Sequence, residues 1–294
     1  MANLTRVGLG IAVLGAVLSQ LSITQSIWTV LKLGLAIGKV LQPISDFPSY
    51  QCRRVHDPLL QACEDMWLSE ATRQLFLACS DSDARNRWMP RTAGDGIINF
   101  AGFAGIELDE GASELLITNF RPSVDSNGEI VPAQAAVGGN ATIEVFRLLP
   151  NTDSLQHMRT VADPAIATPN RVAAAEGKGF YITNDHGQNK IGWGNALSPI
   201  LLTGDVTFCP DGPSSPCRVV SEGYGYPNGL IRSRVDGLIY VPESAQGGIT
   251  VLRPTADNSL EVIYKIDLPY AIDNLSEDQD GTLWAAVLPR GIEI

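Results

Sequence analysis

A short unit that recurs along the chain constrains its fold more than any other feature of the sequence. In each copy, a turn-forming stretch leads into a run of apolar and aromatic residues with the length of one β-strand. The five copies are Arg73–Ala78, Ala112–Ile117, Gly177–Ile182, Asp236–Val241 and Asp280–Ala285. They recur at intervals of roughly 40 to 65 residues, which fits one four-stranded sheet with its loops. This repeat predicts a β-propeller with one copy in each blade.

The sequence between the copies also predicts an all-β domain. Segments such as 142–147 and 249–252 alternate apolar and polar residues, which is the pattern of a half-buried strand. Beyond residue 60, no segment keeps the period of a helix. A β-sandwich would also contain short strands, but it would not repeat the same turn and strand. The propeller is therefore the preferred architecture.

Polar residues stand shortly before four of the five units. They are Glu64, Asp65, Asn170, Asn228, Asp273 and Asn274. The first strand of every propeller blade lines the central channel, so residues at equivalent positions meet on one axis. Carboxylate and amide oxygens are the ligands that a hard cation such as Ca²⁺ prefers. A single Asn is explained equally well as a turn residue. Polar residues that recur at equivalent positions of the repeated unit favour a metal site.

The N-terminal segment differs from the rest of the chain. No charged residue occurs from Val7 to Val30, and Arg6 precedes this stretch. The apolar run from Val7 to Leu18 is typical of a signal peptide. The polar residues after Leu18 instead favour an uncleaved anchor, or a helix that is buried or lies on a membrane surface. We expect a hydrophobic helix within residues 1–44, as a signal peptide or membrane anchor with a linker, and the propeller in residues 45–294.

This division predicts a protein of the secretory pathway, either secreted or held on a membrane through its N-terminus. The sequons at Asn3, Asn140 and Asn274 allow glycosylation in that pathway. The formal net charge of −11 argues against a nucleic-acid partner, because such a protein must neutralise phosphates with Lys and Arg.

The cysteines are compatible with this route. Cys209 and Cys217 bracket a segment rich in Pro, Gly and Ser, which predicts a local disulfide. Cys52, Cys63 and Cys79 leave one odd thiol.

Several motifs of the chain resemble the serum paraoxonase/arylesterase family and its fungal relatives. They are Thr183-Asn184-Asp185-His186, Tyr226-Pro227-Asn228-Gly229, Ile272-Asp273-Asn274-Leu275-Ser276 and Gly281-Thr282-Leu283-Trp284. The similarity runs from about Cys52 to the end of the chain. Members of that family are six-bladed propellers with two calcium ions in the channel, so the resemblance implies this fold and these ions here.

The resemblance also assigns roles to the polar residues. It implies that a catalytic calcium is held by Glu64, Asn170, Asn228, Asp273 and Asn274. That ion would polarise the carbonyl of an ester or lactone while water attacks, with Asp273 and Asn228 as the catalytic residues. Asp65 and the backbone of Ile106 would hold the structural calcium.

The chain departs from the family at the second calcium and at the channel mouth. Arg171 follows Asn170 where the family has an aspartate, so a guanidinium repels or replaces the structural ion, and one calcium is expected instead of two. Ala104, Phe120 and Leu288 stand where the family has histidines. These replacements predict an apolar pocket mouth and require another base, such as Asp273. His186 is interpreted as structural.

The chain also ends earlier than its relatives, which have a further blade and a cysteine that pairs with the counterpart of Cys52. The repeat stops within ten residues of Trp284. We therefore expect a six-bladed type of propeller that is truncated in or after its fifth blade.

Three functions fit these observations. The first is a calcium-dependent arylesterase or lactonase that acts on a small apolar ester, lactone or polyketide-like substrate. The second is an enzyme of secondary metabolism that uses the same pocket for a non-hydrolytic cyclisation, isomerisation or cycloaddition. The third is a non-catalytic binding protein on a membrane.

Overall fold

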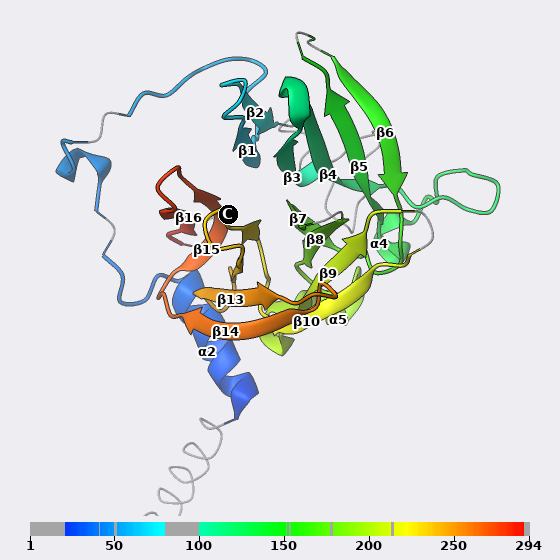
Figure 1. Cartoon of the computed structure of the whole chain (residues 1–294). Coiled ribbons are helices and arrows are strands. Elements are labelled where there is room, and N and C mark those ends of the chain that lie inside the picture. Colours follow the sequence, from blue (N-terminus) through cyan, green and yellow to red (C-terminus); the bar gives the residue numbers. More distant parts are fainter. Residues whose placement is uncertain are drawn as a thin grey trace, which may run out of the picture.

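The computed structural model describes residues 21–40, 42–49, 52–79, 100–150, 152, 154–176, 179–212 and 215–290. Strands dominate this part of the chain, which confirms the predicted all-β class. Figure 1 shows that the sheets stand around a common centre, as the blades of a propeller do. The six-bladed form remains a prediction, because the described residues form five sheets.

All strand pairs within these five sheets are antiparallel. The first sheet contains β1 (Asp65–Leu68) and β2 (Leu75–Ala78). The second contains β3 (Phe100–Glu107), β4 (Ser113–Arg121), β5 (Asn140–Leu148) and β6 (Leu155–Val161). The third contains β7 (Pro169–Ala174), β8 (Gly179–Asn184), β9 (Gly204–Pro210) and β10 (Arg218–Tyr224). The fourth contains β11 (Ile231–Arg232), β12 (Ile239–Pro242), β13 (Ile249–Pro254) and β14 (Leu260–Ile266). The fifth contains β15 (Ala271–Glu277) and β16 (Leu283–Leu288).

The repeated unit of the sequence is the second strand of each sheet. Its five copies fall on β2, β4, β8, β12 and β16, and each of these strands pairs with the first strand of its own sheet. The turns before them explain the pattern, since Gly237 and Gly281 adopt positive φ angles of 72° and 80° that glycine reaches without a steric cost. The predicted repeat is therefore confirmed within the described residues.

The hydrophobic core lies between successive sheets. On β8, Phe180 and Ile182 join one buried cluster with Leu116 and Ile143 of the second sheet. Tyr181, between them, faces the opposite way and joins a cluster with residues of the fourth sheet. The period of two in a strand thus buries both faces of β8. Each such side chain contributes about 1.5–3 kcal/mol by its burial, and this packing fixes the first strands around the centre.

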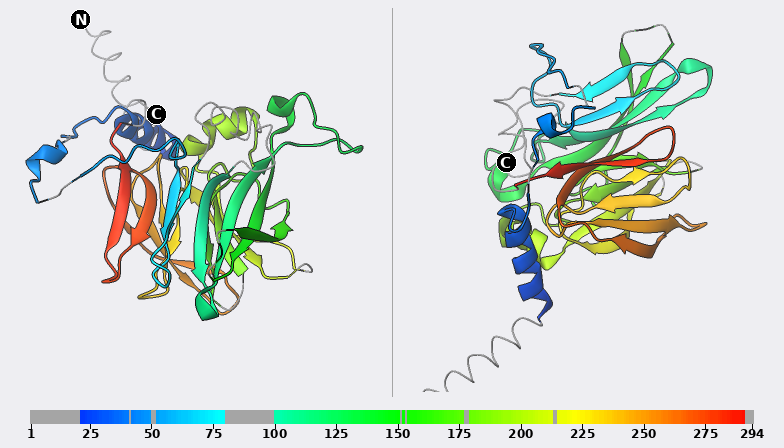
Figure 2. Two further views of the ribbon diagram at one scale, coloured as in Figure 1. Left: turned by 90° about the horizontal axis from the view of Figure 1, so that it is seen from above. Right: turned by 90° about the vertical axis from the view of Figure 1, so that its left-hand side faces the viewer.

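Two helices lie together at one end of the strands. They are α2 (Ser22–Gly34) and α5 (Gly192–Leu201), and the left view of Figure 2 shows both on the same side. The Ser26 hydroxyl donates a hydrogen bond to the Ile200 carbonyl over 2.8 Å and accepts one from Gln246 over 2.7 Å. The short elements are η1 (Ile44–Asp46), η2 (Asp109–Gly111) and α4 (Gln134–Val137).

The predicted N-terminal segment lies partly within the described residues. Helix α2 belongs to it, whereas residues 1–20 lie outside the described part. Among the residues that the structure describes, no helix is long and apolar enough to cross a membrane. The division at residue 44 and the membrane anchor stay predictions.

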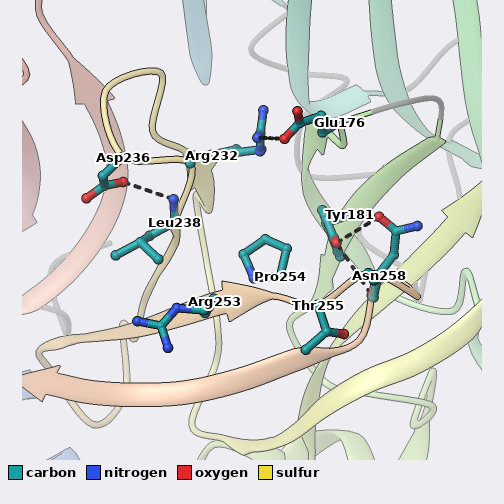
Figure 3. A pocket seen from close by; sticks show the side chains of 11 residues that line it. Glu176, Tyr181, Arg232, Asp236, Leu238, Arg253, Pro254, Thr255 and Asn258 are labelled. Carbon is teal, nitrogen blue, oxygen red and sulfur yellow. Dashed lines mark hydrogen bonds and ion pairs between the residues drawn. The ribbon is translucent and has the colours of Figure 1, made fainter.

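A pocket lies among the turns of the third and fourth sheets, at the opposite ends of their strands from Asn170 and Asn228. Polar side chains dominate its lining, including Arg232, Arg253 and Asn258 (Figure 3). It contains none of the residues that the sequence assigns to the functional site.

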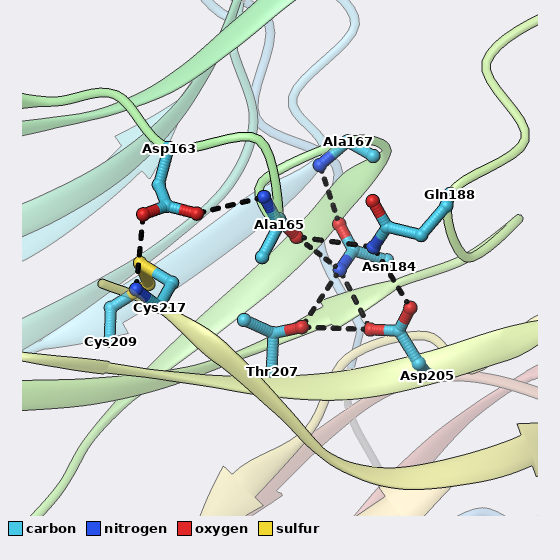
Figure 4. Close-up of a disulfide and its surroundings, with 9 residues drawn as sticks. All are labelled: Asp163, Ala165, Ala167, Asn184, Gln188, Asp205, Thr207, Cys209 and Cys217. Atoms are coloured by element: carbon cyan, nitrogen blue, oxygen red, sulfur yellow. Dashed lines mark hydrogen bonds between the residues drawn. A yellow bond between two sulfur atoms is a disulfide. The ribbon is translucent and has the colours of Figure 1, made fainter.

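The disulfide predicted between Cys209 and Cys217 is confirmed (Figure 4). The backbone N–H of Cys217 donates to the Asp163 carboxylate over 3.1 Å, which fixes the start of β10 against the preceding turn. A second disulfide joins Cys63 to Cys79, and the odd thiol is the exposed Cys52. Two disulfides are typical of a protein that folds in the secretory pathway or outside the cell.

Candidate functional site

The predicted ligands stand at the same end of the first strands of four sheets. Glu64 immediately precedes β1, Asn170 is the second residue of β7, and Asn228 lies three residues before β11. Asp273 and Asn274 lie near the start of β15. The turns that end these strands lie at the other end of the sheets, so the polar residues lie at one shared end of the first strands.

Backbone contacts join the fourth, fifth and first sheets at this point. The Asn274 amide donates to the Glu64 carbonyl over 3.3 Å, and Gly229 forms a parallel bridge with Asn274. The Gly229 N–H donates to the Asp273 carbonyl over 3.1 Å. A Cβ atom on Gly229 would stand 2.0 Å from the Asn274 side-chain oxygen. Glycine is therefore required for the close approach of the two chains.

The amide of Asn228 is oriented by its neighbours. Its Nδ2 donates to the Ser244 hydroxyl over 3.0 Å, and the same amide hydrogen-bonds to the Asp273 carboxylate. Ser244 in turn donates to the Ile272 carbonyl over 2.8 Å. Within the described part of the chain, no donor contacts the side-chain oxygen of Asn228 or Asn274. These amides thus keep their oxygens for a further partner, as cation ligands do.

The charge of Asp273 is destabilised where it stands. Burial, followed by the charges of Glu64 and Asp65, raises the pKa of Asp273 to about 6, against the hydrogen bond from Asn228 and the charge of Arg171. A bound cation would remove this repulsion between carboxylates. The donor atoms are all oxygens, which fits Ca²⁺. No three carboxylate, imidazole or thiol groups of the described residues form a metal cluster, and the predicted set has two carboxylates with three amides.

The residue after Asn170 is connected to this cluster through Thr183. The Thr183 hydroxyl accepts a hydrogen bond from the backbone N–H of Arg171 over 3.2 Å and donates to the Asn228 carbonyl over 2.9 Å. Asn170 is half-buried, and no contact of its side chain with the other predicted ligands is present among the described residues. Sequence reasoning missed Thr183 and Ser244, since single hydroxyl residues carry no distinguishing pattern.

Asp65 has a different partner from the one that the resemblance implies. One of its buried carboxylate oxygens lies 3.0 Å from the Arg171 guanidinium and accepts the Met66 N–H, and the other accepts the Phe103 N–H. Burial raises the pKa of Asp65, and the charge of Arg171 opposes this shift. Arg171 also donates to the Leu275 carbonyl over 3.3 Å. The guanidinium thus places a positive charge against Asp65, and its replacement of a second calcium ion stays a prediction.

In the described part of the chain, no hydrogen bond joins Asp65 to Ile106, the backbone ligand implied for the same ion. It lies on β3, opposite Glu114, and its side chain packs against the core.

The predicted mouth residues do not form a pocket together. Phe120 is 3% exposed and belongs to the hydrophobic core, and Ala104 packs against the same cluster. Placing Phe120 at a channel mouth was therefore wrong, because both strand faces of the second sheet are needed for packing. Ala104 is only partly buried, and its place at a mouth stays a prediction. Leu288 is half-buried at the end of β16. An apolar mouth stays a prediction.

Comparison with known proteins assigns the chain to a family. The family model described as arylesterase matches residues 135–294, which is more than half of the chain. The chain belongs to the arylesterase family. Human serum paraoxonase/arylesterase 1 is 27% identical over 161 residues, covering 52% of this chain and 43% of that protein. Human serum paraoxonase/arylesterase 2 is 28% identical over 153 residues, covering 51% and 42%. The chain thus spans less than half the length of these relatives.

Solved structures are more distant from this arylesterase-family chain. A catalytically inactive virginiamycin B lyase from Staphylococcus aureus aligns with a TM-score of 0.39 and 9% identity, covering 78% of both chains. A glucose dehydrogenase aligns with a TM-score of 0.41 and 11% identity, covering 78% of this chain and 94% of the other. Similarity at this level adds nothing to the fold described above.

Proposed function

We propose that the chain is a calcium-dependent hydrolase of small apolar esters or lactones. The observation that carries this proposal is the group of oxygen ligands at the shared end of the first strands, in a member of the arylesterase family. The ion would be held by Glu64, Asn170, Asn228, Asp273 and Asn274. When bound, calcium supplies a positive charge that polarises the carbonyl of the substrate.

The residues around the proposed site prepare it for this role. Asn228 and Asn274 are oriented by hydrogen bonds from their amide nitrogens, so their oxygens need little reorganisation to meet a cation. The buried pair of Arg171 and Asp65 stands beside the site, and the guanidinium offsets the charge of Asp65. This arrangement supports one calcium ion in place of two.

Hydrolysis of phenyl acetate and δ-valerolactone by the whole chain tests the proposal. Turnover is expected in calcium, with loss after treatment with EDTA and recovery when calcium is restored. Asp273→Asn should abolish the calcium-dependent turnover, whereas Asp257→Asn, a change in an exposed turn, should leave it unchanged. Absence of turnover in calcium-loaded protein would contradict the proposal.

We further propose that the face carrying α2 and α5 contacts a membrane surface. Large apolar side chains point outward from both helices, with exposed fractions of 58% for Trp28 and 82% for Trp193. Leu31 and Leu197 extend this surface at 48% and 39%. Exposed apolar surface of this kind, with tryptophan, suits the interface of a bilayer.

Sedimentation with phosphatidylcholine vesicles tests this contact. Trp193→Ser should reduce the bound fraction several-fold, whereas Trp284→Ser, which changes a residue of β16 that is 55% exposed, should not. Equal binding of the two variants would contradict a role for the helical face.

A further inference from the structure

A histidine and an aspartate lie next to the candidate site, on the connection that follows β8. The backbone N–H of Asp185 donates to the Thr168 carbonyl over 3.0 Å. The backbone N–H of His186 donates to the Thr168 hydroxyl over 3.1 Å. Thr168 lies two residues before Asn170, so these bonds tie the pair to the strand that carries a proposed ligand.

The imidazole of His186 is held in one orientation by Asp185. Its Nδ1 lies 2.7 Å from the Asp185 carboxylate, which can only accept a hydrogen bond when ionised. Nδ1 therefore carries the proton, and Nε2 keeps the basic lone pair of the neutral ring. Within the residues that the structure describes, no group hydrogen-bonds to Nε2, and the side chain is 17% exposed. This is the state in which an imidazole can accept a proton.

Tyr226 connects this pair to the acidic cluster. Its ring packs against the imidazole with 5.0 Å between the ring centres and an angle of 77° between the planes. Its hydroxyl hydrogen-bonds to Asp185, and the charges of Asp185, Asp273 and Glu64 act on it together with burial to raise its pKa well above 10. The phenol thus stands between the Asp185–His186 pair and the carboxylates of the channel.

The backbone at Tyr226 is also unusual. Its φ angle is +59°, a left-handed conformation that aromatic residues rarely adopt. The conformation is maintained by the Ser244 N–H, which donates to the Tyr226 carbonyl over 3.0 Å. Strained residues of this kind concentrate at functional sites. Here the strain places the phenol against His186 and two residues away from Asn228.

We propose that His186, oriented by Asp185 and packed against Tyr226, is the catalytic base that activates water in this chain. The inference rests on the hydrolase function proposed above. One O–H bond of water breaks and its proton passes to Nε2, while the water oxygen bonds to the acyl carbon of the ester or lactone. The bond from that carbon to the leaving oxygen then breaks, and the proton passes from Nε2 to the leaving oxygen.

Other residues suit this role less well. His157 is bound to Glu144 through its Nε2 on β6, in the second sheet, and its side chain is 48% exposed. His56 is exposed and precedes β1. Asp273, which the sequence suggested as the base, is a proposed calcium ligand, and its lone pairs would be engaged by the ion. The described part of the chain offers no other imidazole near the site.

The titratable groups that face His186 are few. Asp185 is on its own segment and Tyr226 is on the connection between β10 and β11. Asp205, near Gly187, is engaged by Asn184 over 2.7 Å. The phenol of Tyr226 donates to Asp185 and so weakens the negative charge beside the imidazole.

The test compares variants in the hydrolysis of phenyl acetate by calcium-loaded protein. His186→Asn places an amide N–H where Nδ1 stood, so the bond to Asp185 can persist while Nε2 is lost. We expect kcat to fall about 100-fold or more, with KM, calcium affinity and melting temperature nearly unchanged. His157→Asn, a matched change in a histidine that also binds a carboxylate, should keep the activity of the wild type.

The pH profile separates a base from a structural residue. A base that must be unprotonated gives kcat/KM an acidic limb, and His186→Asn should remove that limb. An unchanged rate and profile in His186→Asn, with active wild type, would overturn the role of His186 and leave the hydrolase function standing. Inactive wild type would overturn both. Imidazole ¹⁵N shifts give an independent readout, since protonation of Nε2 in place of Nδ1 in the neutral ring would also overturn the proposal.

Discussion

Replacement of Asp273 by Asn should stabilise the cation-free protein while weakening its hold on calcium. The pKa of Asp273 is raised from 3.8 to about 6, first by burial and then by the charges of Glu64 and Asp65. In the folded state the carboxyl thus keeps a proton that the unfolded chain releases between these two pH values. The free energy of unfolding therefore falls as the pH rises through this window, and the loss is complete above pH 6.

The size of the effect follows from the shift. Each pKa unit corresponds to about 1.4 kcal/mol, so a shift of about two units costs the folded state about 3 kcal/mol above the window. An uncharged Asn avoids this cost. For a domain of this size, 3 kcal/mol corresponds to roughly 6 °C or more in melting temperature. In EDTA at neutral pH, we expect the melting temperature of Asp273→Asn to exceed that of the wild type by about that amount. Near pH 4, the two melting temperatures should be nearly equal.

Calorimetry with and without calcium provides the assay. Calcium should raise the melting temperature of the wild type strongly and that of Asp273→Asn weakly, so that the order of the two proteins reverses. Asp257→Asn, in an exposed turn, serves as the control and should follow the wild type under every condition. A variant that is less stable than the wild type in EDTA at neutral pH would refute the reasoning, because it would show that the charge of Asp273 is already compensated.

Two other changes test the surroundings of the site. Gly229→Ala places a Cβ atom 2.0 Å from the side-chain oxygen of Asn274, so it should cost about 1–3 kcal/mol and weaken calcium binding at least tenfold in calorimetric titration. Gly34→Ala, which meets no atom within 4 Å, should do neither. Arg171→Gln leaves Asp65 buried without its partner and should lower the free energy of unfolding by about 3–5 kcal/mol, measured in urea. A double variant that also carries Asp65→Asn should recover most of this loss, and an equal loss in both would contradict the pairing.

The repeat could be predicted from the sequence because each copy combines a local turn with a local strand. Gly237 and Gly281 at positive φ, followed by apolar residues, define second strands without reference to the rest of the chain. Polar residues in otherwise apolar first strands then indicated that these residues lie around a shared axis. In the structure, Glu64 and Asn228 both lie close enough to Asp273 to affect its pKa.

Pairings between distant residues could not be assigned in the same way. The position of Arg171 after Asn170 indicated a competing charge, but only the packing of β3 against both β7 and β1 shows that its partner is Asp65. Phe120 was expected at a channel mouth and lies in the core, because the face of a strand that a sheet buries depends on the neighbouring sheet. Likewise, three cysteines do not reveal which two are bonded until Cys63 and Cys79 are seen together.

Sequence motifs can also bear more than one function. Asn274 belongs to a glycosylation sequon, yet its amide donates to the Glu64 carbonyl within the candidate site. That position is unsuited to a glycan in the folded chain. Asn140, in contrast, is exposed at the start of β5, and glycosylation there stays a prediction.

Calorimetric titration of calcium into protein stripped with EDTA tests the central claim most directly. The oxygen ligands at the end of the first strands, together with the guanidinium of Arg171 on Asp65, predict one ion per chain, lost in Asp273→Asn. Binding of two ions would contradict the replacement of the second cation by Arg171. Absence of binding would contradict the metal site itself, and with it the proposed calcium-dependent hydrolysis.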